Sequence, residues 1–371
     1  MSRVKFGDVV KDVKINIDRL NNPYEYYVAG DHMDSEDLTI HRKGCFTTDD
    51  VGPAFIRVFK PGQILYGSRR TYLKKIAVAD FEGVCANTTF VFETKDPHAF
   101  EQRLLPFIML SKDFTTWSIA KSKGSTNPYV LFSDLADFEF ELPPLEEQKV
   151  LVDKLWAAYR LKEAYKKLLV ATDEMVKSQF IEMFKDLPVN GTISDLTEGA
   201  PTSVKKIYGY EDMIEYIDIS SIDSTSKTVL ETSKHFVGKA PSRAQQCVKN
   251  GDILVSTVRP VNRNIAVIDN DIHNLVASTG FCVLRPKEGY RDYLLSVVTS
   301  DLYTEKMCDK ASGGLYPAVN NSDVLNYGIH IPDEGLANRV SIIYKQADKS
   351  KFELKQCIEN IDKVIKSLIN G

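Results

Sequence analysis

Two long segments of the chain carry the same repeating pattern of apolar positions. After Pro143 and Pro144, no glycine or proline occurs through Phe184, and apolar side chains recur in steps of four and three. This spacing is a heptad repeat, which predicts a helix with one apolar seam along its length. The seam positions are Leu151, Leu155, Ala158, Lys162, Tyr165, Leu169, Thr172 and Val176, and the second segment repeats them as Val340, Tyr344, Ala347, Lys351, Leu354, Ile358, Ile361 and Ile365.

We expect the two helices to run antiparallel and to pair through these seams. A single helix with one apolar seam is marginally stable in water, whereas two such helices bury each other's seams. The alternative is that each helix packs only on its own domain. Both seams have a lysine in the fourth place, Lys162 and Lys351. Extension of these side chains from the seam edge into water is favoured over a role in fixing the helix register.

The segments outside the helices alternate short runs of β-forming residues with turns. Such runs occur at residues 64–66, 76–79 and 89–92, and again at 253–255, 264–268 and 281–284. Helical spacing follows each set, between Phe100 and Trp117 and between Arg291 and Met307. The pattern predicts α+β domains built on a strongly bent antiparallel sheet.

The whole arrangement occurs twice, because the chain aligns with itself after a shift of 189 residues. The first copy has Lys60, Gly62, Ile64, Leu65, Arg70, Ile76, Ala77, Val78 and Asp80 where the second has Lys249, Gly251, Ile253, Leu254, Arg259, Ile265, Ala266, Val267 and Asp269. A long repeat in only two copies predicts two similar domains and not a solenoid. The predicted boundaries are a mixed domain at 1–142, a helix at 143–186, a second mixed domain at 187–331 and a second helix at 332–371.

Composition indicates a protein without disulfides or a membrane span. The six cysteines form no CxxC pair, and no apolar run is long enough to cross a bilayer. We expect reduced thiols and a cytoplasmic location. The net charge is −4, yet residues 42–75 hold eight lysines and arginines against two aspartates, and residues 234–263 hold six against one. A solvated face explains one such cluster, but its recurrence in both repeats favours a surface for phosphates.

Motifs for catalysis are missing from the sequence. It contains no GxxxxGK[ST] phosphate loop, no GxGxxG fingerprint and no histidine or cysteine set with metal-ligand spacing. The segments Asn21–Tyr24 and Asn127–Tyr129 faintly resemble the Asn-Pro-Pro-Tyr loop of amino-methyltransferases, but each lacks the second proline. Turn formation explains both of them.

Two pairs of equivalent loops carry the candidate contact residues. One pair joins strands around Arg70 and Arg259, and the other is the basic, glycine-bearing pair 121–129 and 310–317. Arginine can bond guanine, asparagine can bond adenine, and lysine and hydroxyl groups can bond phosphates, although ordinary hairpin chemistry would also explain these loops. The candidates for DNA binding are Ser68, Arg69, Arg70, Thr71, Lys74, Lys75, Lys123, Ser125, Thr126, Thr257, Arg259, Asn262, Arg263, Ser312 and Tyr316.

The order of these features resembles the specificity subunit of type I restriction–modification systems. The resemblance rests on the segment Gly124–Tyr129, on Phe138–Leu142, on the junction Leu142-Pro-Pro-Leu-Glu-Glu-Gln148 before a long helix, on Gly251–Val255, and on the repetition of this order. The second junction, Ile331–Ala337, departs from the pattern because it lacks Glu-Glu-Gln. This departure puts in doubt a detailed contact at that junction.

The resemblance implies an α+β fold with two pseudo-symmetric target-recognition domains, separated by two long antiparallel coiled-coil helices. Each domain would read one half of a bipartite double-stranded DNA site, without a membrane association. The chain would bind two methyltransferase subunits, which modify adenine N6, and motor-nuclease subunits through them. It would carry no metal or cofactor, because S-adenosylmethionine, ATP and magnesium would lie on the partner subunits.

Two other functions stay open from the sequence. One is a self-contained adenine methyltransferase with degenerate motifs, which would bind S-adenosylmethionine as an isolated chain. The other is a coiled-coil adaptor that joins two proteins, which would show no salt-dependent DNA affinity.

Overall fold

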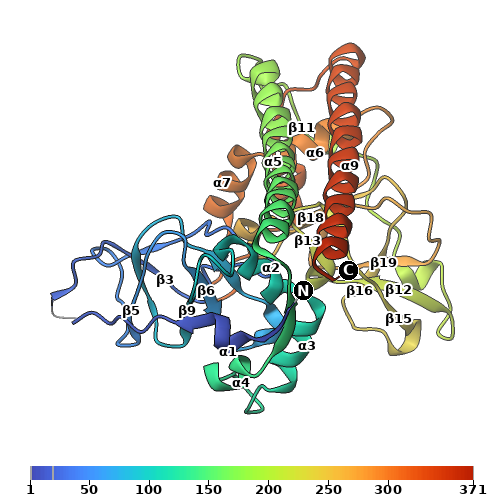
Figure 1. Ribbon diagram of the computed structural model, residues 1–371. Helices are drawn as coiled ribbons and strands as arrows, with labels where there is room; N and C mark the ends of the chain where they lie inside the picture. Colours follow the sequence, from blue (N-terminus) through green and yellow to red (C-terminus); the bar gives the residue numbers. More distant parts are fainter. Residues whose placement is uncertain (1, 19–20, 371) are drawn as a thin grey trace. The chain divides into compact units, whose positions relative to one another are not determined.

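A computed structural model describes residues 2–18 and 21–370 (Figure 1). The predicted domain ends at residues 1 and 371 lie outside this part of the chain. The structure divides into two compact units: residues up to Lys167 together with those from Lys355 onward, and Leu168–Leu354. The four predicted domain boundaries stay a prediction. No helix among the described residues is long and apolar enough to cross a membrane.

The mixed part of the first unit contains two four-stranded sheets and four short α-helices. One sheet has the order β2 (Val10–Asp12), β9 (Thr89–Thr94), β6 (Ile64–Gly67), β7 (Ile76–Val78), and the outer sheet has the order β4 (Gly44–Cys45), β3 (Tyr26–Val28), β8 (Gly83–Ala86), β5 (Phe55–Phe59). A further pair joins β1 (Ser2–Lys5) to β10 (Glu139–Leu142), and the helices are α1 (Phe6–Val9), α2 (Leu105–Leu110), α3 (Lys112–Ala120) and α4 (Phe132–Ala136).

The mixed part of the second unit has matching elements. An inner sheet has the order β18 (Ile265–Val267), β17 (Ile253–Ser256), β20 (Phe281–Leu284), and an outer sheet has the order β15 (Ser233–Phe236), β12 (Met213–Ile217), β19 (Leu275–Ser278), β16 (Ala244–Cys247). Two-stranded pairs join β11 (Gly191–Thr192) to β21 (Gly328–Ile329) and β13 (Ile222–Asp223) to β14 (Thr228–Val229). The short helices are α6 (Arg291–Thr299), α7 (Asp301–Lys310) and α8 (Asn321–Leu325).

The expectation of purely antiparallel sheet is wrong in one respect. In the first unit β3 pairs with β8 in parallel, and in the second unit β12 pairs with β19 in parallel. A parallel pair needs a long connection between its strands. The connection is long in both units because other strands lie between the two partners in the sequence. The folds are therefore mixed α/β, with helices against sheets of both pairing types.

The long helices are α5 (Leu145–Phe184) and α9 (Glu334–Asn370), and each unit contains part of both. In the first unit, Ile365 of α9 lies in the same buried cluster as Leu155 of α5. In the second unit, Val340 and Tyr344 of α9 belong to the cluster that Phe180 of α5 contacts. Every predicted seam residue is buried or half-buried. In both units, the start of one long helix thus shares a core with the end of the other.

Two equivalent ion pairs connect α5 and α9, one in each unit. The Nζ atom of Lys162 lies 2.6 Å from Oδ1 of Asp362, and that of Lys351 lies 3.1 Å from Oδ1 of Asp173. The lysines correspond to each other in the 189-residue repeat, and so do the aspartates. The expected extension of both lysines into water is therefore wrong, since each side chain reaches an aspartate of the other helix.

At the junctions before the two long helices, the equivalent carbonyl oxygens of Pro143 and Pro332 accept hydrogen bonds from different side chains. Gln148 is fully buried, and its Nε2 donates to the carbonyl oxygens of Pro143 and Ala99 at 2.8 and 2.9 Å. The second unit has the small, buried Ala337 in the equivalent place, and the hydroxyl of Tyr290 lies 3.4 Å from the carbonyl oxygen of Pro332. The missing glutamine in the second junction is thus a change of local contact, and the helix still forms.

Candidate nucleic-acid interface

Each unit brings its two predicted loops together into one surface. In the first unit, the backbone N–H of Arg70 donates to the carbonyl of Pro128 at 2.6 Å, and that of Val130 donates to Ser68 at 2.9 Å. We call residues 68–75 and 121–129 the first loop surface. Residues 257–263 and 310–317 form the second loop surface, where the N–H of Arg259 donates to Pro317 at 2.7 Å. The same backbone contacts therefore build both surfaces.

Both surfaces hold two cationic residues in a left-handed backbone conformation. Arg70 has a φ of 51° and Lys74 of 47°, and they flank the 3₁₀ turn η2 (Thr71–Leu73). Arg259 at 48° and Arg263 at 51° flank η8 (Pro260–Asn262) in the same way. This conformation costs an ordinary residue roughly 1–2 kcal/mol. Backbone strain of this kind clusters at functional sites, because the fold must provide a gain elsewhere to keep it.

The first loop surface presents two arginines without partners. Arg69 and Arg70 are exposed, and no hydrogen bond or ion pair joins either guanidinium group to the described residues. Tyr72 beside them is 53% exposed. The polar side chains of Ser125 and Thr126 are also exposed on the second loop of this surface. These groups are free to contact a ligand.

Three of the four lysines of the first loop surface have hydrogen-bond or ion-pair partners within the unit, and the Nζ atom of the fourth, Lys121, lies 4.7 Å from the ring centroid of Trp117. Lys74 forms an ion pair with Glu36, Lys75 donates to the carbonyl of Gly30, and Lys123 lies 2.9 Å from Asp134. The hydrogen bond from Lys74 is the main cause that lowers the pKa of Glu36, and the bond from Lys123 is the main cause that lowers the pKa of Asp134. The charges of Lys74 and Lys123 are partly neutralised, so Arg69, Arg70 and Lys121 carry most of the free positive charge of the surface.

The second loop surface holds its central arginine in place. The guanidinium carbon of Arg259 lies 4.6 Å from the ring centroid of Tyr316, and Nη2 donates to the carbonyl of Leu315 at 3.2 Å. Arg263 forms an ion pair of 2.6 Å with Asp301. Asn262 and Ser312 are exposed. Arg259 is therefore stacked and oriented, whereas Arg70 is not.

Three of the candidate contact residues are inside the fold, which corrects the prediction for them. Ser68 is 6% exposed and donates to the carbonyl of Thr88, and Thr257 is 7% exposed and donates to Gly280. Thr71 is 3% exposed, and its hydroxyl bonds that of Ser122. These hydroxyls close the loops by internal hydrogen bonds, so they are not available to DNA.

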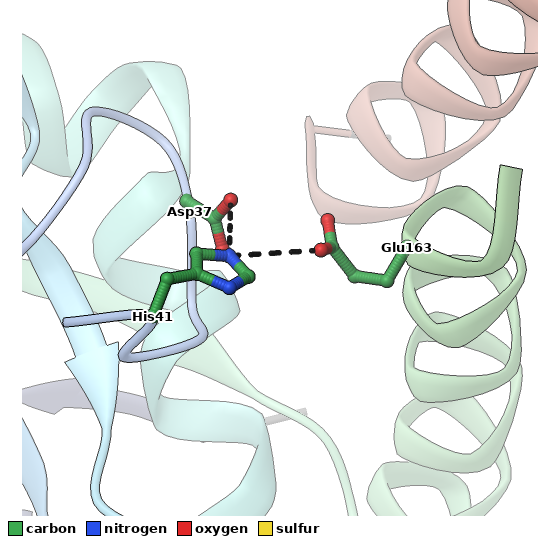
Figure 2. Close-up of side chains that lie close together, drawn as sticks. All are labelled: Asp37, His41 and Glu163. Atoms are coloured by element: carbon green, nitrogen blue, oxygen red, sulfur yellow. Dashed lines mark hydrogen bonds and ion pairs between the residues drawn. The ribbon is translucent and has the colours of Figure 1, made fainter. Parts of the chain in front are cut away.

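A polar cluster that the sequence did not point to lies in the first unit, with Asp37 buried, Glu163 half-buried and His41 exposed. Figure 2 shows Asp37, His41 and Glu163, whose ligand atoms lie within 4.8 Å of one another, a spacing that a metal ion could use. The Nζ atom of Lys166 already lies 2.9 Å from Asp37 and 2.8 Å from Glu163. An ammonium group thus supplies the positive charge, and the cluster fastens the segment around Asp37 to α5.

Asp37 is the centre of this cluster. The hydroxyl of Tyr159 donates to its Oδ1 at 2.6 Å, and the backbone N–H of Thr39 donates to the same oxygen at 2.9 Å. Burial alone would raise the pKa of Asp37, but the hydrogen bonds from Tyr159, Thr39 and Lys166 outweigh it and lower the pKa to about 2. Asp37 therefore stays ionised and acts as an anchor for its loop.

Comparison with known proteins shows that part of the chain is similar to one family. Residues 19–169 match the model of the type I restriction modification DNA specificity domain. The chain is 26% identical over 174 residues to the type I restriction enzyme HindI specificity subunit of Haemophilus influenzae, which covers 46% of this chain and 38% of that protein. It is 28% identical over 142 residues to the EcoDI specificity subunit of Escherichia coli, which covers 37% of this chain and 31% of that protein. The alignments thus span about a third of each relative's length.

Solved structures share the fold over nearly the whole chain. A chain from a structure described as "Structural basis underlying complex assembly and conformational transition of the type I R-M system" has a TM-score of 0.58 at 19% identity, covering 99% of this chain and 96% of that one. The type I restriction–modification S subunit from M. genitalium has a TM-score of 0.54 at 14% identity, covering 99% and 95%. At these identities the likeness concerns the fold.

Proposed function

We propose that the chain recognises a DNA sequence for a type I restriction–modification system, because residues 19–169 match the model of that DNA specificity domain and the chain is similar to specificity subunits. Each unit reads one half of a bipartite double-stranded site. The observation that carries this proposal is the pair of loop surfaces, which share a strained backbone and differ in their side chains. Two units that recognise different half-sites would share a backbone scaffold and differ in the side chains that contact the bases.

The side chains on the loop surfaces suit contacts with base edges and phosphates. Arg70 and Arg259 can each form two hydrogen bonds to O6 and N7 of guanine in the major groove. Asn262, Ser125 and Thr126 are exposed hydrogen-bonding groups beside them. Most bonds from such groups to phosphate position the protein, while the bonds to base edges select the sequence. Arg259, stacked on Tyr316, needs less ordering on binding than Arg70 does.

We propose that α5 and α9 form an antiparallel coiled coil that sets the unread gap between the half-sites. The seam residues and the pairs Lys162–Asp362 and Lys351–Asp173 support this role. The separation of two half-sites must match the helical repeat of DNA, so a stiff spacer is useful. An insertion of four residues near Ala171 should change the accepted gap and leave both half-sites unchanged.

The proposed subunit has no active site of its own. Two adenine-N6 methyltransferase subunits would bind to it and carry S-adenosylmethionine, and motor-nuclease subunits would join through them with ATP and magnesium. The family relationship supports these partners. The loop surfaces also fit a contact role, since their exposed groups donate hydrogen bonds and form no catalytic arrangement.

The test is adenine-methylation sequencing of a host that carries this chain with its methyltransferase partner. We expect one bipartite motif with a fixed gap, which disappears when the chain is deleted. Methylation that persists without the chain would contradict the proposal. Binding of S-adenosylmethionine to the isolated chain would contradict it as well and would favour a methyltransferase.

A further inference from the structure

The outer sheet of the second unit has a depression that lies apart from the second loop surface. Its volume is about 500 Å³, and it is formed by residues around β12, β15 and β16. The lining includes Val204, Lys205, Tyr208, Tyr210, Val237, Gly238, Ala240, Pro241, Ser242, Ala244 and Gln245. Both apolar and polar side chains line it.

An exposed aromatic side chain lines this depression. Tyr210 is 70% exposed, yet its ring packs against Gly238 so closely that a Cβ atom there would lie 2.1 Å from the ring. The N–H of Gly238 also donates to the carbonyl of Tyr210 at 2.9 Å. The absence of a side chain at Gly238 thus leaves room for the exposed ring to lie against the backbone.

Lys205 lines the depression, and three further cations are sequence neighbours of its lining residues. Lys205, Lys206, Lys239 and Arg243 are exposed, and none forms an ion pair or side-chain hydrogen bond with the described residues. The neighbouring acidic groups are Glu211 and Asp212, and a carboxylate oxygen of Asp212 accepts the N–H of Gly209 at 2.7 Å. In the two segments that line the depression, 204–212 and 237–245, the four positive charges therefore exceed the two negative ones. On the first loop surface, by contrast, three of the four lysines have internal hydrogen-bond or ion-pair partners.

The first unit differs at most of the corresponding places of the repeat. The bridge between Asn16 and Arg57 matches the bridge between Ser203 and Gln246, so in this segment the repeat is offset by 187 residues, and Lys205 and Lys206 correspond in the sequence to Asp18 and Arg19. Asp50 and Ala54 take the positions of Lys239 and Arg243, and Asp49 stands where the second unit has Gly238. Three of the four cations, and the glycine beside the ring, are thus absent from the first unit.

We propose that this depression, together with Lys205, Lys206, Lys239 and Arg243, binds the phosphate backbone of duplex DNA beside the half-site read by the second unit. The proposal rests on the function proposed above. Phosphates along a duplex attract several cations at once and release counterions on binding, so unpaired charges on two loops match this ligand. The exposed Tyr210 adds a hydroxyl and a flat face for the sugar–phosphate chain. DNA contacts should therefore extend farther on the second half-site than on the first.

The test uses the complex of this chain with its methyltransferase partner and a duplex that carries the methylated motif. The variant Lys205→Ala/Lys239→Ala/Arg243→Ala should lower the slope of log affinity against log salt by about 2 to 3, since each phosphate contact contributes about 0.9. Hydroxyl-radical footprinting should show the lost protection beside the second half-site only. Sequence preference in the motif should stay the same.

A matched control removes the same charge from α9 of the same unit. Arg339, Lys345 and Lys349 are exposed and have no ion pair among the described residues, and alanine suits a helix. The control variant Arg339→Ala/Lys345→Ala/Lys349→Ala should keep the parental salt slope. If the first triple variant does not fold, Lys239→Ala and Arg243→Ala should each lower the slope by about 0.9.

The outcomes separate this inference from the proposed function. An unchanged salt slope in the rim variants, with a parental complex that binds its motif, would overturn the inference alone. An equal loss in the α9 control would also overturn it, because the effect would then be one of net charge. A parental complex that shows no motif-dependent binding would contradict the proposed function itself.

Discussion

The first and second loop surfaces have the same backbone but use their central arginine differently. Arg70 has no side-chain partner among the described residues, whereas Arg259 is stacked on Tyr316 and bonded to the Leu315 carbonyl. Their backbones are strained alike, with φ values of 51° and 48°. The comparison shows that the two repeats share the backbone conformation that positions a cation, whereas the side chains around that cation differ. A flexible arginine side chain loses conformational entropy when it binds a ligand, whereas a stacked arginine has already lost part of that entropy in the free protein.

The largest expected effect comes from removing each arginine in turn. Arg70→Ala should weaken binding by about 10- to 100-fold and relax the sequence preference at one half-site, since a bidentate arginine–guanine contact contributes about 1–3 kcal/mol. Arg259→Ala should do the same at the other half-site. Affinities of the methyltransferase complex for duplexes with substitutions in either half would measure this. Equal relaxation of both halves by one variant would break the comparison.

The Asp37 anchor distinguishes the first unit by its response to acid. The pKa of Asp37 is lowered from 3.8 to about 2, so its contribution to stability is complete above pH about 4 and is lost as the pH falls toward 2. The contribution should be about 2 kcal/mol. Asp37→Asn should lower the free energy of unfolding of the first unit at pH 6. Below pH 4, the free energy of unfolding of this variant should fall less steeply with decreasing pH than that of the parent. Trp117 and Trp156 both belong to the first unit, so tryptophan fluorescence in urea reports its unfolding.

An unchanged acid profile in Asp37→Asn would argue against Asp37 as the anchor. Asp34→Asn is a suitable control, because Asp34 is about half exposed and bonds only Arg42 on the surface. Its acid profile should follow that of the parent.

The two ion pairs between α5 and α9 should contribute unequally to the free energy of unfolding, although they occupy equivalent positions in the sequence repeat. The side chain of Lys162 is 13% exposed and that of Asp362 is 36% exposed, against 28% for Lys351 and 54% for Asp173. Lys162→Asp should lower the free energy of unfolding of the first unit by about 1–2 kcal/mol, and adding Asp362→Lys should restore most of it. Tryptophan fluorescence in urea measures both variants.

The equivalent change in the second unit is the control for that result. Lys351→Asp should leave the tryptophan-reported transition unchanged, since both tryptophans lie in the first unit. Failure of Asp362→Lys to rescue Lys162→Asp would show that the pair does not act as a unit.

The smallest effect concerns the strained backbone of the loops. Arg70→Gly should raise the free energy of unfolding of the first unit relative to Arg70→Ala by about 1 kcal/mol, because glycine adopts a positive φ without strain. Both variants should lose DNA affinity equally. A glycine variant that is less stable than the alanine variant would show that position 70 is not strained in the folded protein.

The repeated parts of the fold could be read from the sequence because local pattern determines them. The seams of α5 and α9, the strands β6, β7 and β9 and their equivalents all follow from periodicity. Side-chain direction and tertiary partners could not be read in this way. The burial of Ser68, Thr71 and Thr257, the Lys162–Asp362 pair and the Asp37 anchor depend on segments far apart in the chain. The carbonyl of Pro332 likewise meets Tyr290, which no pattern near the junction indicates.

The parallel pairs β3–β8 and β12–β19 escaped prediction for a related reason. Their strands are short and belong to the outer sheets, where the two repeats have diverged. The depression around Tyr210 lies in the same diverged region. The repeat in the sequence predicted the two loop surfaces, because both units have them. The depression around Tyr210 differs between the units, so only the structure revealed it.

The central claim is that each unit reads its own half of a DNA site, and an exchange of units tests it most directly. Residues 191–331 would be replaced by the equivalent residues 2–142, with both long helices kept, and the adenine methylation of a host carrying this chain would be sequenced. The account predicts a symmetric motif made of two inverted copies of the half read by the first unit. A motif that retained the half formerly read by residues 191–331 would contradict it.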